Sequence, residues 1–301
     1  MAARPVVKWA GGKSRLLFDL MERLPSGRFR TYAEPFCGGG AMFFALASAK
    51  PRPFDRALLS DKNEELVALY RAVKSEVAAL IERLREYQET HLAKDPDARR
   101  EHFYEVRKND KVVGDVERGA RLVFLNKTCF NGLWRVNASG RFNVPFGKYA
   151  SPKILDVDTL KAASKALACA EIRGADYSQI CAELRRGDFA YFDPPYVPVS
   201  KTANFTAYAR DRFGWEEQEQ LAAAVAKLAK KGVHAMLSNA ATSELHALYR
   251  RHGFHVSTIR AARAINSDPT KRGDVEEIVA TTYDASTGRR AEAPRRKGIP
   301  A

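Results

Sequence analysis

An α/β fold built on an open sheet is predicted by three segments of the sequence. In each, a short apolar run ends in glycine, proline or an acid; the segments are residues 31–40, 56–61 and 189–193. Such runs are typical of buried strands, and open α/β sheets place their chemistry at the carboxyl ends of their strands. The 301 residues, 45% of them hydrophobic, allow one large domain or one domain with a substantial insertion.

Composition excludes several classes of protein. No apolar run is long enough to cross a membrane, and we expect no signal peptide, because the first residues lead straight into structured-looking sequence. The cysteines Cys37, Cys129, Cys169 and Cys181 show no paired metal-binding spacing, so we expect reduced thiols and no metal. The net charge of +14 favours a polyanionic partner, although part of it falls in the tail at 285–301.

The first motif is Lys8-Trp9-Ala10-Gly11-Gly12-Lys13, which precedes a helical pattern at 14–22. A Gly-Gly turn that opens a helix presents backbone N–H groups to an anion. Trp9 can cover an aromatic ring, and Lys13 can pair with a carboxylate. The spacing is not that of a phosphate-binding P-loop, and a plain helix-start turn explains the segment equally well.

A glycine loop follows the first predicted strand, with the sequence Glu34-Pro35-Phe36-Cys37-Gly38-Gly39-Gly40, and a helical pattern follows at 41–49. Glycines let the backbone approach a ligand closely, and a helix N-terminus favours a negative group. The second predicted strand ends at Asp61, where an acid commonly binds the ribose hydroxyls of an adenosine cofactor. Loop and acid together predict an adenosine-containing ligand. A nicotinamide cofactor fits less well, because the loop lacks the G-x-G-x-x-G spacing.

The middle of the chain divides into three stretches. Residues 62–92 repeat apolar positions at helical spacing, and residues 93–120 are polar and highly charged without a clear pattern. Residues 121–153 contain arginines, lysines and aromatic residues but no acid, and Asn137-Ala138-Ser139-Gly140 predicts the turn of a hairpin. A basic, aromatic hairpin without acids indicates a nucleic-acid reader. The alternative is a hairpin that packs its aromatic side chains on its own domain.

The rest of the chain continues the alternation of helices and strands. We predict helices at 157–168, 216–230 and 243–251, and strands at 169–172, 189–192, 233–238, 254–259 and 278–283. Asp176 and Tyr177 follow one of these strands, where an acid or an aromatic ring can contact the adenine of a cofactor. Residues 200–208 are predicted to form a loop beside the site, and residues 285–301 a disordered basic tail.

The motif Asp193-Pro194-Pro195-Tyr196 ends the strand at 189–192. The carboxylate of Asp193 accepts one N–H, and the carbonyl of Pro194 accepts a second, because proline donates none. Tyr196 offers a ring on which a base can stack. These groups suit the exocyclic amino group of a planar base, whose lone pair stays available for attack. An ordinary strand-ending turn is the alternative, since Asp and Pro are common there.

In this order, the motifs resemble those of the Dam family of DNA adenine N6-methyltransferases, over roughly residues 6–284. The most specific parts are Asn131-Gly132-Leu133-Trp134-Arg135-Val136-Asn137, Arg141-Phe142-Asn143-Val144-Pro145-Phe146-Gly147-Lys148-Tyr149 and Asp193-Pro194-Pro195-Tyr196 with the residues up to Tyr208. The resemblance implies a Rossmann-like S-adenosylmethionine-dependent methyltransferase fold with an inserted, mainly helical target-recognition domain that carries a β-hairpin. The catalytic domain then comprises 1–63 and 158–284, the recognition domain 64–157 and the tail 285–301.

The resemblance also assigns site residues. The positions that match cofactor-binding residues are Trp9, Lys13, Phe36, Gly38, Asp61, Asp176 and Asp193, with S-adenosylmethionine as methyl donor and S-adenosylhomocysteine as product. The positions that match DNA-binding residues are Lys8, Asn131, Leu133, Arg135, Pro145 and Lys148, with GATC as the implied target. Direct readout of a guanine by Arg135 is chemically sensible.

The sequence therefore predicts an adenine N6-methyltransferase on double-stranded DNA, located in the cytoplasm with the nucleoid and without an obligate protein partner. The target base is flipped out of the stack, and Asp193, Pro194 and Tyr196 form the catalytic group. No metal and no cysteine nucleophile take part. The alternatives are a methyltransferase acting on cytosine N4 or on RNA adenine, and a catalytically idle DNA-binding regulator.

Overall fold

The computed structural model of the protein describes residues 2–196, 213–262 and 274–287. Within these residues, seven strands form one sheet in the order β3-β2-β1-β4-β5-β7-β6. Strands β1 to β5 are parallel, and β7 runs antiparallel between β5 and β6. The strands are β1 (Phe29–Glu34), β2 (Phe54–Asp61), β3 (Ala170–Gly174), β4 (Phe189–Phe192), β5 (His234–Ala240), β6 (His255–Ala262) and β7 (Asp274–Thr281). The predicted α/β class is confirmed, and the order is Rossmann-like, with its switch point between β1 and β4.

The central strands are buried on both faces, which explains their unbroken apolar sequences. Successive side chains of β4 alternate between two hydrophobic cores: Phe189 and Tyr191 enter the first, and Ala190 and Phe192 enter the second. Because the side-chain period of a strand is two, one short run supplies both cores. A shift of one residue in the register of β4 would exchange large and small side chains between the cores.

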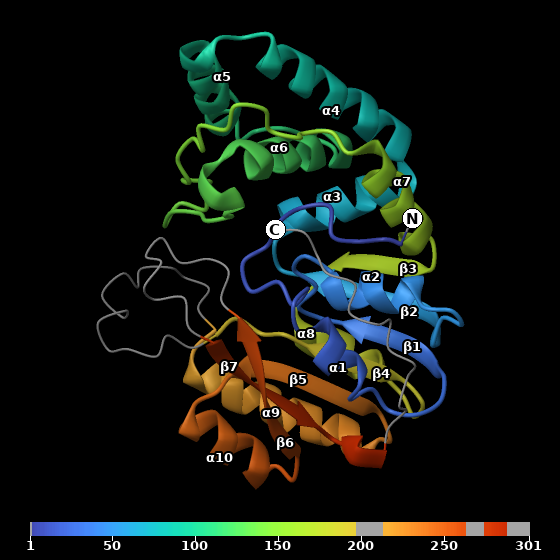
Figure 1. Ribbon diagram of the computed structural model, residues 1–301. Coiled ribbons are helices and arrows are strands. Elements are labelled where there is room, and N and C mark those ends of the chain that lie inside the picture. Colours follow the sequence, from blue (N-terminus) through green and yellow to red (C-terminus); the bar gives the residue numbers. More distant parts are fainter. Residues whose placement is uncertain (1, 197–212, 263–273, 288–301) are drawn as a thin grey trace.

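Helices cover both faces of the sheet (Figure 1). The first core is covered by α1 (Leu17–Met21), α2 (Ala41–Ser48), α3 (Glu64–Ser75) and α7 (Val157–Leu167), and the second by α8 (Tyr177–Glu183), α9 (Trp215–Lys230) and α10 (Ser243–Arg251). The helix predicted at 14–22 is shorter than expected. The strand predicted at 278–283 begins earlier, at Asp274. The sequence did not indicate its first half, because that half carries the acids Glu276 and Glu277, which are unusual in strands.

A helical part lies beyond α3, at the β3 side of the sheet (Figure 1). It contains α4 (Val77–Leu92), α5 (Pro96–Lys108) and α6 (Asp115–Thr128). The helical pattern at 62–92 is two helices, which break at Glu76 (φ −134°, ψ 34°). The charged stretch at 93–120 also forms helix: the Asp95 side chain caps α5, and Pro96 occupies its first turn. The pattern was not recognisable there because α5 buries only Phe103 and Val106.

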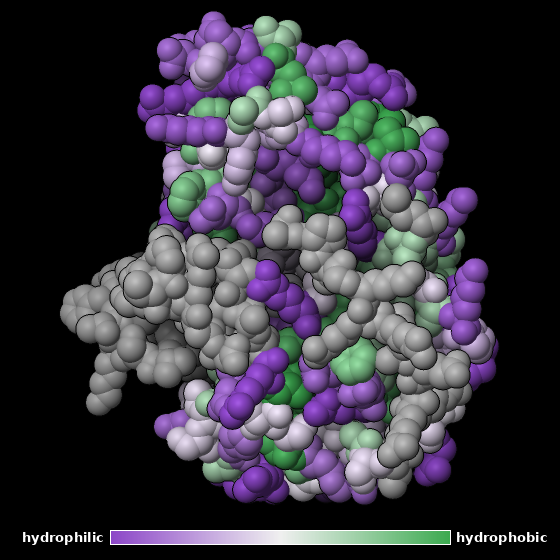
Figure 2. All heavy atoms as spheres, in the orientation of Figure 1, coloured by the Kyte–Doolittle hydropathy of each residue, from purple (hydrophilic) through white to green (hydrophobic). Residues whose placement is uncertain are grey.

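The outer surface of the helical part is mostly hydrophilic in Figure 2, and hydrophobic residues appear on that face in small separate groups. Among the residues that the structure describes, no helix combines the length and apolar character needed to cross a membrane.

The predicted turn at 137–140 is present, but its flanks pair only through isolated bridges, Val136 with Phe142 and Cys129 with Phe146. The side chain of Asn137 accepts hydrogen bonds from the N–H groups of Ser139 and Arg141, both at 3.0 Å. Gly140 takes the left-handed conformation (φ 74°) that closes the turn. We call residues 129–149 the recognition hairpin.

The aromatic residues of the hairpin differ in burial. Phe142 is buried and lies 4.8 Å from the Trp134 ring, whereas Phe130 is 48% exposed and Tyr149 is 40% exposed. Arg121, counted among the basic residues of this stretch, is buried in α6. Its guanidinium donates to the carbonyls of Val106 and Arg107 at the end of α5, so it closes a helix terminus and presents no charge at the surface.

Candidate active site

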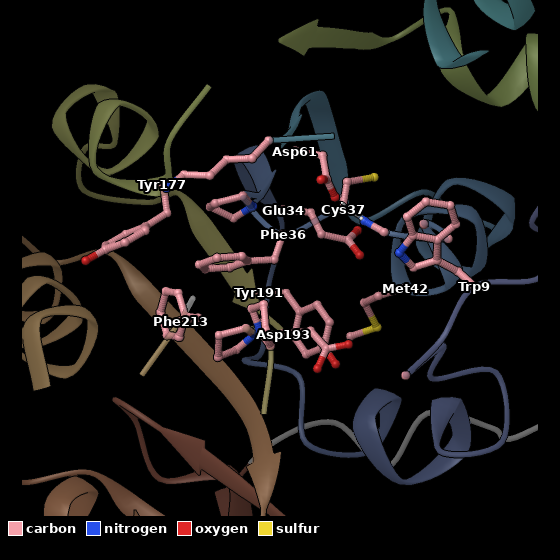
Figure 3. A pocket seen from close by; sticks show the side chains of 18 of the residues that line it. Trp9, Glu34, Phe36, Cys37, Met42, Asp61, Tyr177, Tyr191, Asp193 and Phe213 are labelled. Carbon is pink, nitrogen blue, oxygen red and sulfur yellow. Dashed lines mark hydrogen bonds between the residues drawn. The ribbon is translucent and has the colours of Figure 1, made fainter. Parts of the chain in front are cut away.

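A cavity of about 830 Å³ opens at the carboxyl ends of the parallel strands (Figure 3). It is lined by the Trp9–Lys13 turn, the glycine loop after β1, Asp61 at the end of β2, Asp176 after β3 and the Asp193–Tyr196 motif after β4. The structure therefore brings together all the residues that the sequence assigned to catalysis and cofactor binding. This is the edge where an open α/β sheet with this topology binds its ligands.

Asp61 shapes the glycine loop. One carboxylate oxygen accepts a hydrogen bond from the Gly38 N–H and the other from the Asn63 N–H, both at 2.9 Å. Gly38 has a positive φ (48°), and a Cβ there would lie 3.0 Å from the ring of Trp9. Only glycine fits this position without strain. Burial raises the pKa of Asp61, although these backbone hydrogen bonds oppose the shift.

Asp193 lies at the end of β4 with a cation and a hydroxyl beside it. Its Oδ1 is 2.8 Å from Lys13 Nζ and 3.1 Å from Ser238 Oγ, which also bonds the hydroxyl of Tyr191 at 2.7 Å. Burial raises the pKa of Asp193, and the charge of Lys13 opposes that shift. Lys13 itself is only 4% exposed, so this is a buried ion pair at the edge of the cavity.

A buried polar chain holds the back of the same motif. Gln218 on α9 is fully buried, and its amide N–H donates to the Pro195 carbonyl at 3.2 Å. Its carbonyl oxygen accepts from Asn239, whose amide also donates to the hydroxyl of Tyr249, both at 2.9 Å. These bonds hold the peptide that joins Pro195 to Tyr196, in the second half of the motif.

Glu34 forms the floor of the cavity between Asp61 and Asp193 (Figure 3). It is buried, and one of its oxygens accepts from the Tyr32 hydroxyl at 2.7 Å and the Phe43 N–H at 3.1 Å. Burial raises the pKa of Glu34 to about 8. At neutral pH this carboxyl group is therefore predominantly protonated, which limits the negative charge in the cavity.

Aromatic rings form one side of the cavity, opposite Trp9 (Figure 3). The ring of Phe36 stacks on Tyr177 at 5.6 Å and meets Phe213 edge-on at 5.4 Å. Asp176 caps α8 beside them and lies 2.8 Å from Lys62. Flat apolar faces next to carboxylates suit a ligand that has a planar ring with N–H groups.

The family is decided by sequence comparison. A family model described as the D12 class of N6 adenine-specific DNA methyltransferases matches residues 9–265. The chain belongs to this family. The predicted resemblance to the Dam family is confirmed, and so is the predicted activity, methylation of adenine in DNA.

Curated relatives of this methyltransferase match nearly its whole length. The type II methyltransferase M.MjaIII of Methanocaldococcus jannaschii is 40% identical over 293 residues, which cover 94% of this chain and 100% of the relative. The type II methyltransferase M1.LlaDCHI of Lactococcus lactis subsp. cremoris is 36% identical, with coverage of 93% and 95%. The DNA adenine methylase of Escherichia coli is 34% identical, with coverage of 92% and 94%.

The residues that the sequence assigned to DNA binding lie outside the cavity of the methyltransferase. Asn131, Leu133, Arg135, Pro145 and Lys148 all belong to the recognition hairpin, and none of them lines the cavity. Arg135 donates to the side chain of Asn143 at 2.7 Å, which holds its guanidinium along the outside of the hairpin. Asn131 and Lys148, near the two ends of the hairpin, both have positive φ angles (57° and 53°). The backbone therefore changes direction sharply at both ends.

Lys8 joins these residues through Asn126, a buried residue of α6 that sequence reasoning did not single out. The Asn126 side chain accepts from the Lys8 N–H at 3.0 Å and donates to the carbonyls of Lys8 and Gly132 at 2.8 and 2.9 Å. Trp9, the next residue, stacks on Trp134 at 6.2 Å. The cavity and the recognition hairpin are therefore joined through two consecutive residues.

Gln218, Asn239 and Phe213 are the other site residues that the sequence did not indicate. Gln218 and Asn239 lie in ordinary helix and strand sequence, and only the fold brings them to the back of the Asp193–Tyr196 turn. Phe213 precedes α9 and contacts Phe36 and Tyr177. Cys37 also lines the cavity, but burial raises the pKa of its thiol, which disfavours the reactive thiolate. In the described part of the chain, no cluster of three His, Cys, Asp or Glu side chains could hold a metal ion.

Proposed function

We propose that this chain transfers a methyl group from S-adenosylmethionine to N6 of an adenine that is flipped out of double-stranded DNA. The observation that carries the proposal is the cavity itself. The acceptors of the Asp193-Pro194-Pro195-Tyr196 motif and the carboxylate of Asp61 face the same space of about 830 Å³. One end offers groups for an amino-bearing base, and the other offers groups for a nucleoside.

The residues present fit S-adenosylmethionine. Its adenine would lie against Phe36 and Tyr177 near Asp176, and its ribose hydroxyls would donate to Asp61. A carboxylate has lone pairs beyond those taken by the backbone of the glycine loop. Trp9, Lys13 and the Gly38 backbone would hold the remainder. When bound, this cofactor supplies an electrophilic methyl group on a positively charged sulfur.

The chain's own groups position the acceptor nitrogen. The Asp193 carboxylate and the Pro194 carbonyl accept the two N–H groups of adenine N6, and Tyr196 stacks on the base. With both N–H groups accepted, the lone pair of the nitrogen would remain available for attack on the methyl group that the cofactor supplies. The negative charge of Asp193 also stabilises the positive charge that develops on N6. Catalysis then rests mainly on orientation of the two reactants.

For DNA recognition we propose a target-recognition domain at 64–157, inserted between catalytic segments 1–63 and 158–284. Lys8, Asn131, Leu133, Arg135, Pro145 and Lys148 are its proposed DNA contacts, and GATC is its proposed target. The exposed, acid-free hairpin supports the proposal, because groove readers present arginine and asparagine side chains to base edges. An adenine inside the stack cannot reach Asp193, so the base must be flipped into the cavity.

The decisive experiment methylates a plasmid with the purified protein and S-adenosylmethionine, then digests it with nucleases of opposite methylation sensitivity at GATC. Protection from the methylation-sensitive nuclease and cleavage by the methylation-dependent one are expected. Methyl transfer to adenines outside GATC would overturn the proposed target but not the activity. Absence of any transfer would favour the idle regulator.

Substrate class is tested separately with labelled cofactor on double-stranded DNA, single-stranded DNA and RNA of the same sequence. Label in N6-methyladenine of the duplex is expected. Label in RNA, or in N4-methylcytosine, would contradict the proposal.

A further inference from the structure

Lys13 lies between two carboxylates. Its Nζ is 2.8 Å from Oδ1 of Asp193 and 3.8 Å from Oε2 of Glu277, and the Lys13 and Glu277 side chains are 4% and 12% exposed. Glu277 comes from β7, which is inserted antiparallel between β5 and β6. Neither the glycine loop nor the Asp193–Tyr196 motif points to this residue in the sequence.

Glu277 is left without a full set of partners. Its Oε2 is buried and forms no hydrogen bond of good geometry among the described residues, and neither does the hydroxyl of Tyr196, although the two groups lie close enough to interact. Lys13 Nζ also lies over the Tyr196 ring, 5.0 Å from its centroid. A buried carboxylate oxygen without a partner is costly, so Glu277 Oε2 is poised to accept a donor that is already close.

Lys13 is such a donor, and its present position conflicts with the reaction. The Asp193 oxygen that carries the ammonium also accepts from Ser238, and in the proposed function the same carboxylate must accept the amino group of adenine. Both present donors lie on Oδ1, so the amino group is left with the other oxygen, Oδ2, of a carboxylate whose charge the ammonium already neutralises. A cation held on Asp193 would also oppose the positive charge that develops on N6 during transfer.

We propose that Glu277 is a positioning residue that takes the ammonium of Lys13 when the amino group of the target base binds Asp193. This inference rests on the proposed role of Asp193. A shift of Nζ by about 1 Å is enough to turn the 3.8 Å contact into a charge-assisted hydrogen bond. Lys13 then neutralises Glu277, and the charge of Asp193 faces the base.

The test compares Glu277→Gln with Glu276→Gln. The first substitution keeps the size of the side chain but removes the charge that attracts Lys13. The neighbouring Glu276 is a matched control, because it is exposed and its carboxylate pairs with Arg260. In single-turnover methylation of duplex DNA with saturating cofactor, Glu277→Gln should lower the rate about tenfold or more, and Glu276→Gln less than about twofold. Cofactor affinity, measured by calorimetry, and thermal unfolding should stay close to wild type for both.

A double-mutant cycle identifies the route. If Glu277 acts through Lys13, adding Glu277→Gln to Lys13→Met should change the rate less than about twofold, although it matters in the wild-type background. An equal loss in both backgrounds would overturn the inference, as would a wild-type rate in Glu277→Gln. Asp193→Ala distinguishes failure of the proposed function from failure of this inference. High activity of Asp193→Ala would reject the proposed role of Asp193. An inactive Asp193→Ala together with a wild-type rate in Glu277→Gln would reject only the role of Glu277.

Discussion

The cavity and the recognition hairpin are built in opposite ways. In the cavity, Asp61, Asp193 and Glu34 lie at the ends of buried strands, and each accepts at least two hydrogen bonds or ion-pair contacts from nearby groups. In the hairpin, isolated bridges and one turn hold the backbone. Arg135 there touches a neutral amide, and Arg141 forms an exposed pair with Asp110.

This difference corresponds to two functions, orientation of reactants and contact with a nucleic-acid groove. Groups that orient reactants have to be fixed before the substrate arrives, and a sheet edge surrounded by hydrogen bonds provides that. Groups that contact a groove have to remain exposed and to exchange their protein partners for bases and phosphates. Changes in the cavity should therefore alter rate and cofactor affinity, whereas changes in the hairpin should alter sequence preference and salt dependence.

The largest effect is expected for Asp193→Ala. Loss of the main acceptor for N6 should lower turnover about a thousandfold or more. Duplex affinity, measured by fluorescence anisotropy, should remain near wild type, because phosphate contacts by Lys and Arg supply most of it. Near-normal methyl transfer by this variant would contradict the catalytic assignment, and a parallel loss of DNA binding would erase the separation between cavity and hairpin.

Asp61→Ala should weaken S-adenosylmethionine binding by about 1.5–3 kcal/mol, the range for hydrogen bonds to a charged group. Titration calorimetry measures this directly. Exposed Asp55, on the same strand but outside the cavity lining, gives the matched control Asp55→Ala. If both variants bind the cofactor as wild type does, Asp61 does not belong to the cofactor site.

Arg135→Ala should cost about 1–3 kcal/mol on the correct site, if its guanidinium reads a guanine edge. The loss should be smaller on duplexes altered at that base, so the preference at one position flattens. Arg141→Ala is the control at the other side of the turn. If Arg141 contacts only phosphate, Arg141→Ala should weaken binding to all sequences about equally and lower the salt slope by roughly one unit. Equal losses on every duplex for Arg135→Ala would remove it as the base reader.

The last prediction concerns the pH dependence of stability. Because burial raises the pKa of Glu34 from 4.5 to about 8, the folded protein holds a proton there that the unfolded chain releases at a lower pH. The contribution of this group to stability is therefore present at low pH and is lost as pH rises through that window, by up to about 1.4 kcal/mol per pH unit. Glu34→Gln should flatten the profile in urea unfolding, whereas Glu82→Gln on the exposed face of α4 should not. Parallel profiles for Glu34→Gln and wild type would show that Glu34 does not keep its proton in the folded protein.

The sequence predicts the cavity better than the hairpin, because the cavity is built at the ends of buried strands. Strand ends in this fold converge at one edge, so Asp61 and Asp193 can be placed from apolar runs and turn residues alone. Glu277 and Gln218 escape this reasoning, because a β7 that starts with acids does not read as a strand and Gln218 lies within an ordinary helix. Arg121 gave a wrong expectation of surface charge. The sequence shows a positive charge among aromatic residues, but whether that charge faces solvent depends on the packing of α5 against α6. The loop predicted at 200–208 and the tail beyond Thr287 lie outside the described residues.

Asn126 has a consequence for the exchange of specificity between related enzymes. Its three hydrogen bonds join Lys8 to Gly132, and a Cβ at Gly132 would lie 3.0 Å from the Lys8 side chain. Under the role proposed for the hairpin, an exchange of target preference would replace residues 129–149 by the equivalent segment of a relative and keep Gly132. The junction has to be kept in any such graft, because it joins the hairpin to the Trp9 side of the cavity.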